Sequence, residues 1–102
     1  MARGRAPTEF TFKATVIEWR GPSPFFYAPI PREQAEAIRQ VAKFVSYGWG
    51  VIPVEATIGG VRFATSLFPK YGIYLLPIKA EVRRRTGVTV GDVVEVEMTV
   101  GG

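Results

Sequence analysis

Residues Ile78–Val100 read IKAEVRRRTGVTVGDVVEVEMTV, and this stretch decides the fold that the sequence predicts. It predicts the end of a strand, a short basic helix over Lys79–Arg85, a turn on Gly87 and Gly91, and a closing strand from Asp92. In the closing strand apolar and polar residues alternate, which is typical of a strand with one buried face and one wet face. We expect the rest of the chain to be arranged around this helix, turn and strand.

Three segments are predicted at the N-terminal end of the chain. Met1–Thr8 is small, basic and contains proline, which predicts a disordered basic arm. Glu9–Trp19 alternates as a half-buried strand does, and the side that faces the core holds Phe10, Phe12, Ala14 and Val16. Phe25–Ile30 is aromatic and bracketed by Pro29 and Pro31; because proline cannot donate to a ladder, we expect an edge strand or an extended segment.

A helix is predicted to begin at Pro31 or Arg32 and to end at Gly48-Trp49-Gly50, since glycine readily takes the left-handed cap conformation. Its apolar face has residues at three-and-four spacing: Ala35, Ile38, Val41, Ala42 and Val45. On the solvated face, Glu36 stands three residues before Arg39, which favours a weak ion pair.

The middle of the chain predicts a hairpin of Val51–Ile58, the two-residue loop Gly59-Gly60, and Val61–Phe68. In this register Ile58 faces Val61 and Thr57 faces Arg62. Glu55 is then the diagonal neighbour of Arg62, so we expect a surface ion pair between them.

A turn over Pro69–Gly72 leads into a further predicted strand, Ile73–Ile78. Five or six strands with two short helices predict a mostly β fold. We expect a small closed or double-split pseudobarrel capped by helices, formed by residues 9–102 as a single domain.

Composition narrows the function classes. The 102 residues carry a formal charge of +4, and nine of the thirteen cationic residues are arginine, which favours carboxylate or phosphate partners. The absence of Cys and His excludes disulfides, zinc sites of the usual kind and His-based triads. We expect no enzyme activity and no cofactor. Without a long apolar run or a signal pattern, a cytoplasmic protein with no membrane contact is expected.

The densest charge cluster is Arg83-Arg84-Arg85, with Lys79 one helical turn earlier. One interpretation is a solvated helix in which Glu81 pairs with Arg85; the other is an anion site, because arginine offers a rigid fork of donors. Asp92 follows Gly91, and its carboxylate is expected to accept hydrogen bonds from the turn. The aromatic residues Trp19, Phe25, Phe26, Tyr27 and Trp49 form either core or the rim of a pocket.

Spaced motifs along most of the chain resemble one known family. They are Trp49-Gly50 followed by Pro53-Val54, Thr57-Ile58-Gly59-Gly60, Thr65-Ser66-Leu67-Phe68-Pro69, Gly72, Tyr74-Leu75-Leu76-Pro77, Lys79, Val82-Arg83, Gly87 and Gly91-Asp92. From about Phe10 to Val100 the chain resembles DUF1905, a prokaryotic family of small domains of unknown function. The resemblance implies a double-split β-barrel capped by helices, and it implies no activity.

A more distant resemblance involves the C-terminal stretch alone. Val82-Arg83, Gly87-Val88, Gly91-Asp92 and Val94–Val96 are similar to the AbrB-like barrel regulators, in which a helix leads through a Gly-Asp turn into a strand. Those proteins bind DNA as swapped dimers. The long hairpin and the additional helix of this chain depart from their pattern.

Two binding hypotheses follow. In the first, the chain is a non-enzymatic binding module for an anionic small molecule or a peptide carboxylate, which is held by Arg62, Lys79 and Arg83 with Trp49, Phe26 and Tyr74 nearby. In the alternative, it is an AbrB-like nucleic-acid-binding protein that uses Arg3, Arg5, Arg83, Arg84 and Arg85. An exposed edge strand in so short a chain also favours a homo-oligomer.

Overall fold

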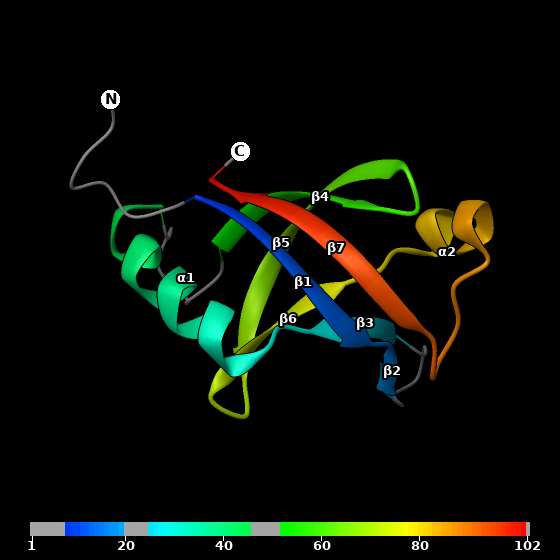
Figure 1. Cartoon of the computed structure of the whole chain (residues 1–102), viewed down its shortest axis with the longest axis horizontal. Coiled ribbons are helices and arrows are strands. Elements are labelled where there is room, and N and C mark those ends of the chain that lie inside the picture. The colour runs from blue at the N-terminus through cyan, green and yellow to red at the C-terminus, as the bar shows by residue number, and fades with distance from the viewer. Residues whose placement is uncertain (1–7, 20–24, 46–51, 102) are drawn as a thin grey trace.

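The computed structural model describes residues 8–19, 25–45 and 52–101, and the mostly β class is confirmed. The elements in order are β1 (Glu9–Thr15), β2 (Ile17–Trp19), β3 (Phe25–Pro29), α1 (Arg32–Val45), β4 (Ile52–Ile58), β5 (Val61–Lys70), β6 (Ile73–Pro77), α2 (Ala80–Thr86) and β7 (Val93–Val100). The two helices lie at opposite ends of the long axis of the molecule (Figure 1). The predictions for the arm over residues 1–7 and for the glycines that end α1 lie outside the described residues.

The strands form one antiparallel series in the order β1-β7-β4-β5-β6-β3-β2. Its two end strands, β1 and β2, are consecutive in the chain and are separated only by Val16. β5 likewise has two pairing partners along its length. It pairs with β4 up to Leu67 and with β6 from Phe68 onward. Two long stretches of chain are therefore each divided between two neighbours, as in a double-split pseudobarrel.

The expected alternative of a closed barrel is wrong. β1 pairs with β7 and β2 pairs with β3, and no ladder joins β1 to β2 in the described part of the chain. At Val16 the chain leaves one ladder and enters the other, so a gap opens there instead of a continuous ring of hydrogen bonds. A second gap opens where β5 passes from β4 to β6.

The core follows the predicted alternation. In β1 the even-numbered residues Phe10, Phe12 and Ala14 are buried and the odd-numbered ones are exposed, and β7 buries Val94, Val96, Met98 and Val100 in the same way. The two strands pair in the register Phe12 to Val96. α1 adds its predicted apolar face, of which Ala35, Ile38 and Val41 are buried, and its solvated face carries the expected pair of Glu36 and Arg39 at 2.6 Å.

The hairpin of β4 and β5 has the predicted register, with Ile58 opposite Val61 and Thr57 opposite Arg62. The expected turn over Pro69–Gly72 is wrong in its first half, because Pro69 and Lys70 continue β5 and only Tyr71-Gly72 turns. Lys70 and Ile73 flank this two-residue turn, so Pro69 falls at a position whose backbone N–H is not needed by β6.

The expectation of an edge strand over Phe25–Ile30 is also wrong, since β3 lies between β2 and β6. The backbone N–H groups of Ile30 and Ile78 donate across this ladder, to Tyr74 and Phe26 respectively. The intervening prolines, Pro29 and Pro77, therefore occupy positions that do not hydrogen-bond in this ladder. Proline is tolerated in this interior strand because the ladder between β2 and β3 extends only to Tyr27. Pro29 therefore has no β2 partner that would need its N–H.

Candidate functional site

Three of the six residues predicted to hold an anion come together beside α2. Lys79, Arg83 and Phe26 line one cavity of about 370 Å³. The other residues that line it are Phe25, Pro77, Ile78 and Ala80. Apart from Lys79 and Arg83, every side chain of this α2 cavity is apolar. Sequence reasoning missed Pro77, Ile78 and Ala80 as lining residues, although they directly flank Lys79 in the sequence.

The backbone brings these residues together. Ile78 N donates to the carbonyl oxygen of Phe26 at 2.8 Å, which fastens the segment leading into α2 against β3. Val82 is the buried residue of α2 and holds the helix against the core. At its other end α2 stops at Gly87, whose φ of 77° is the left-handed conformation of a helix cap and whose N–H donates to the carbonyl oxygen of Arg83.

The turn after α2 is held as the sequence predicted. The Asp92 carboxylate accepts a hydrogen bond from Thr89 N at 2.9 Å. Gly91 N donates to the carbonyl oxygen of Val16, and Val16 N donates to that of Asp92. The turn is thus attached to the residue at which the chain passes from β1 to β2, and Asp92 has a structural role.

Arg83 is placed by an aromatic ring. Its guanidinium carbon lies 3.8 Å from the centroid of the Phe26 ring, and its Nε is 3.4 Å from the carbonyl oxygen of Ile78. A guanidinium that covers a ring keeps its N–H edge available for other partners. Among the described residues, no carboxylate forms an ion pair with Arg83.

Lys79 is held by the edge of the sheet. Its Nζ donates to the carbonyl oxygen of Ala64 at 2.9 Å. Because Ile58 and Val61 flank a two-residue turn, the backbone groups of Ala64 point away from β4, toward the gap that opens along β5. Lys79 therefore bridges that gap, and within the described part of the chain it too has no carboxylate partner.

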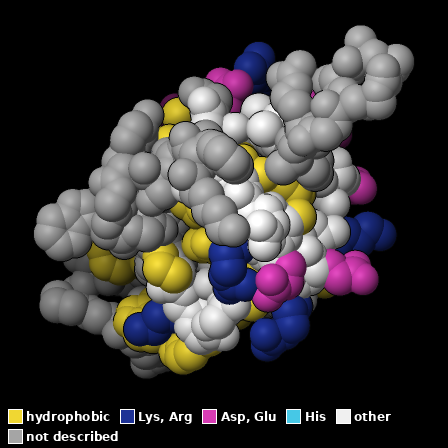
Figure 2. Space-filling view, turned by 90° about the vertical axis from the view of Figure 1, so that its left-hand side faces the viewer, with side chains coloured by type: hydrophobic (Ala, Val, Ile, Leu, Met, Phe, Trp, Pro, Cys, Tyr) yellow, Lys and Arg dark blue, Asp and Glu magenta, His cyan; other side chains and the backbone are white. Residues whose placement is uncertain are grey.

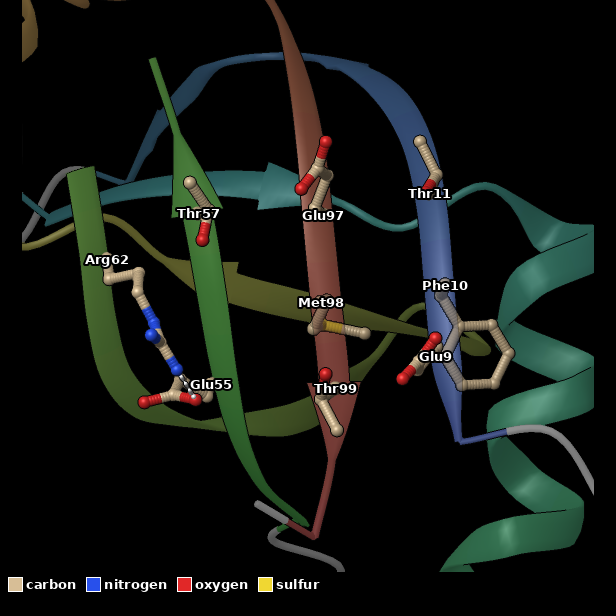
Figure 3. Close-up of a pocket in the computed structure, with 9 residues that line it drawn as sticks. All are labelled: Glu9, Phe10, Thr11, Glu55, Thr57, Arg62, Glu97, Met98 and Thr99. Atoms are coloured by element: carbon tan, nitrogen blue, oxygen red, sulfur yellow. Dashed lines mark hydrogen bonds and ion pairs between the residues drawn. The ribbon is translucent and has the colours of Figure 1, made fainter. Parts of the chain in front are cut away.

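Arg62, the fourth predicted residue, lies elsewhere. It belongs to a second hollow of about 400 Å³ on the outer face of β1, β7, β4 and β5, which we call the sheet-face hollow (Figure 3). Its Nη2 donates to Glu55 Oε1 at 2.7 Å, which confirms the ion pair expected from the hairpin register. Glu9 and Glu97 also line this hollow, so an anion would meet three carboxylates and one guanidinium there.

The fifth predicted residue, Tyr74, is core. Its exposed fraction is 7%, and its ring lies 5.9 Å from the guanidinium carbon of Arg39 in α1. The hydrogen bond and the charge of Glu36 raise the pKa of Arg39 above its ordinary value. The sixth, Trp49, and the arm residues Arg3 and Arg5 lie outside the described residues.

The three arginines of α2 have different surroundings. Arg83 faces the α2 cavity, whereas Arg84 lies 3.5 Å from Glu81 and Arg85 is exposed. The pairing of Glu81 differs from the expected one with Arg85, and both spacings are allowed on a helix surface. On the α1 side of the molecule, Figure 2 shows Lys and Arg side chains directly beside Asp and Glu side chains in the described area. That visible area presents no patch of one sign.

The arrangement beside α2 places two cationic side chains, Lys79 and Arg83, among apolar walls. In the described ranges, no group of three or more acidic side chains lies close enough together to hold a metal ion, and this includes the three carboxylates of the sheet-face hollow. Neither α1 nor α2 is long and apolar enough to cross a bilayer.

A family model described as Domain of unknown function (DUF1905) matches residues 12–98, a range that includes Phe26, Lys79 and Arg83. It does not support the more distant likeness to AbrB-like barrels. No curated protein is found to be similar to the chain.

Proposed function

The chain belongs to the DUF1905 family, whose function is unknown, and from the geometry beside α2 we propose that it is a non-enzymatic binding module for an anionic small molecule or a peptide carboxylate. The observation that carries the proposal is that Lys79 and Arg83 line a cavity whose other lining side chains are apolar. No carboxylate of the described chain pairs with either cation. An anionic ligand would supply the missing charge.

Both cations are already oriented. The ring of Phe26 covers the Arg83 guanidinium at 3.8 Å, and the carbonyl oxygen of Ala64 accepts from Lys79 at 2.9 Å. Groups held in place before binding lose less conformational freedom when the ligand arrives, which favours affinity. The planar fork of arginine suits the two oxygens of a carboxylate.

The size and the walls of the cavity favour a ligand with an apolar body. Its volume of about 370 Å³ lies within the range of small-molecule sites, roughly 300–1,000 Å³. Phe25 lines it and is 55% exposed, so a ligand could cover apolar surface that is now in water. An anion with an apolar body would therefore use the cations and the walls together.

A binding panel tests the proposal. Benzoate, acetate, inorganic phosphate and a short peptide with either a free or an amidated C-terminus would be titrated by isothermal calorimetry into wild type, Arg83→Ala and Arg85→Ala. Arg85 is a matched control because it lies on the same helix, has the same charge and does not line the cavity. We expect at least one anion to bind wild type and Arg85→Ala alike and to bind Arg83→Ala much more weakly.

Two outcomes would contradict this function. One is that no anion of the panel binds wild type at millimolar concentration. The other is that Arg83→Ala and Arg85→Ala lose affinity equally, because that result would indicate general charge attraction instead of a site.

The nucleic-acid alternative rests on Arg84 and Arg85, whose side chains face solvent near Arg83. If they act with Arg83, Arg3 and Arg5 on about five phosphates, the logarithm of the affinity should fall with the logarithm of salt at a slope near −4 to −5. Fluorescence anisotropy with duplex and single-stranded DNA at two salt concentrations measures this slope. Unchanged anisotropy at low salt would remove the alternative.

A further inference from the structure

A second group of aromatic residues surrounds Lys70 at the tip of the β5–β6 hairpin. The Nζ of Lys70 lies 4.4 Å from the centroid of the Trp19 ring and 5.5 Å from that of Tyr71, and the two ring centroids are 6.1 Å apart. No carboxylate of the described residues forms an ion pair with Lys70. The ammonium group is therefore held chiefly by the faces of two rings.

The backbone of Tyr71 has a strained conformation. Tyr71 has a φ of 55°, and in the described chain it is the one residue other than glycine with a positive φ. Two-residue hairpin turns of this kind favour Asn-Gly, because a bulky side chain in the left-handed region is strained. Tyr71 is 70% exposed, so burial in the core does not compensate for the strain. Strain at an exposed residue outside the core points to function.

A cavity adjoins Trp19 and Lys70 of this group. It has a volume of about 170 Å³ and is lined by Trp19, Tyr27, Lys70 and Leu75. Tyr27 is 9% exposed, and burial raises the pKa of its phenol above the ordinary value. The walls are thus aromatic or aliphatic apart from the lysine itself.

We propose that Trp19, Tyr71 and Tyr27 form an aromatic site for a quaternary ammonium group, and that the side chain of Lys70 occupies this site when no such ligand is bound. None of these residues lines the α2 cavity, so the proposal is independent of the anion site. A quaternary ammonium carries the same charge as lysine but is less strongly hydrated, and aromatic cages prefer it for that reason. The flexible stem of Lys70 allows its head group to move into solvent.

Removing the resident cation gives the sharpest test. Tetramethylammonium would be titrated by calorimetry into wild type and Lys70→Ala, and the Trp19 indole N–H signal, assigned with Trp19→Phe, would be followed by NMR. We expect Lys70→Ala to bind about 2- to 30-fold more tightly than wild type, the range that corresponds to a cation–π contact of ordinary strength. The indole signal of Trp19 should shift along the same titration curve.

A second variant separates binding from folding. Tyr71→Asn in the Lys70→Ala background removes the ring and places in the turn a residue that tolerates a positive φ. We therefore expect an unchanged or higher melting temperature together with a loss of tetramethylammonium affinity. A ring with a purely structural role would give the opposite result, a lower melting temperature.

The source of the ligand is distinguished by comparing choline with Nε-trimethyllysine. Tighter binding of choline indicates a small molecule, and tighter binding of trimethyllysine indicates a modified protein; either result supports the site. Three results would overturn it. They are no binding by Lys70→Ala, equal affinities of wild type and Lys70→Ala, and equal binding of the neutral isostere of choline in which carbon replaces the quaternary nitrogen.

Discussion

The sheet-face hollow and the α2 cavity each contain an arginine, but the two side chains are in opposite electrostatic situations. Arg62 is paired with Glu55 at 2.7 Å, whereas Arg83 covers the Phe26 ring at 3.8 Å and has no carboxylate partner in the described chain. The difference follows from the elements that carry them. A ladder places neighbouring side chains of two strands on one face, while α2 lies against a ring and against backbone carbonyl groups. Of these two arginines, only Arg83 is left by its tertiary neighbours without a carboxylate partner in the described chain.

The largest effect is expected from loosening α2. Val82→Ala removes two buried methyl groups, and Val82 is 2% exposed, so we expect a loss of about 2 kcal/mol in the free energy of unfolding. Urea denaturation measures it. The matched control is Val93→Ala, since Val93 is 66% exposed and its truncation should change stability by less than about 0.5 kcal/mol. Equal losses in the two variants would show that Val82 does not anchor the helix.

Exchanging each arginine for lysine sharpens the comparison. Arg83→Lys keeps the charge but loses the planar fork and the contact with Phe26, so we expect anion affinity to fall about tenfold, or about 1.4 kcal/mol. Arg62→Lys keeps a positive charge beside Glu55 and should leave that affinity unchanged. Calorimetry with the anion that binds most tightly measures both. A loss of the same size in Arg62→Lys would contradict the distinction between the two regions.

Removing the ammonium group of Lys79 should have a smaller effect. Lys79→Met keeps an apolar stem but removes the hydrogen bond to the carbonyl oxygen of Ala64, which contributes about 1 kcal/mol to stability. Lys13→Met, at an exposed position of β1, serves as the control for the loss of one charge. Thermal and urea unfolding would compare the two. If the control is destabilised as much, the bridge across the gap along β5 contributes nothing of its own.

The smallest effect is expected at the sheet face. Glu55→Gln removes the partner of Arg62, and an exposed pair of this kind is worth about 0 to 1 kcal/mol. The difference from wild type should shrink further as ionic strength rises, because exposed charges are screened by salt. Unfolding experiments at low and at high salt test this. A stability difference that persists at high salt would indicate that the pair stabilises the fold by more than a charge attraction that salt can screen.

Much of the fold was accessible from the sequence. The two-residue loop at Gly59-Gly60 sets the register of its hairpin and so predicts that Glu55 meets Arg62. The turn at Gly87 that follows α2 and the role of Asp92 were likewise predictable, because each depends on residues within one turn. For the candidate site, the sequence indicated Lys79 and Arg83, which are one helical turn apart, as members of one cluster.

The position of Phe26 relative to that cluster could not be derived from local patterns. It lies more than fifty residues before Lys79 in the chain, and it reaches the α2 cavity only because β3 pairs with β6. The prolines in and around β3 suggested an edge strand, since a sequence does not reveal which ladder a proline faces. Tyr74 and Arg62 were predicted to join the site because they are aromatic and cationic, but their strands direct them into the core and onto the sheet face.

The sequence by itself determined which residues alternate, where the chain turns and which cations exist, because these depend on neighbours within a few positions. The tertiary structure alone decided that β1 and β2 part at Val16, that β5 passes from β4 to β6, and that Arg83 meets a ring while Arg62 meets a carboxylate. The physical reason is that ladder pairing between distant strands is selected by the packing of the whole core. No period in the local sequence encodes that choice.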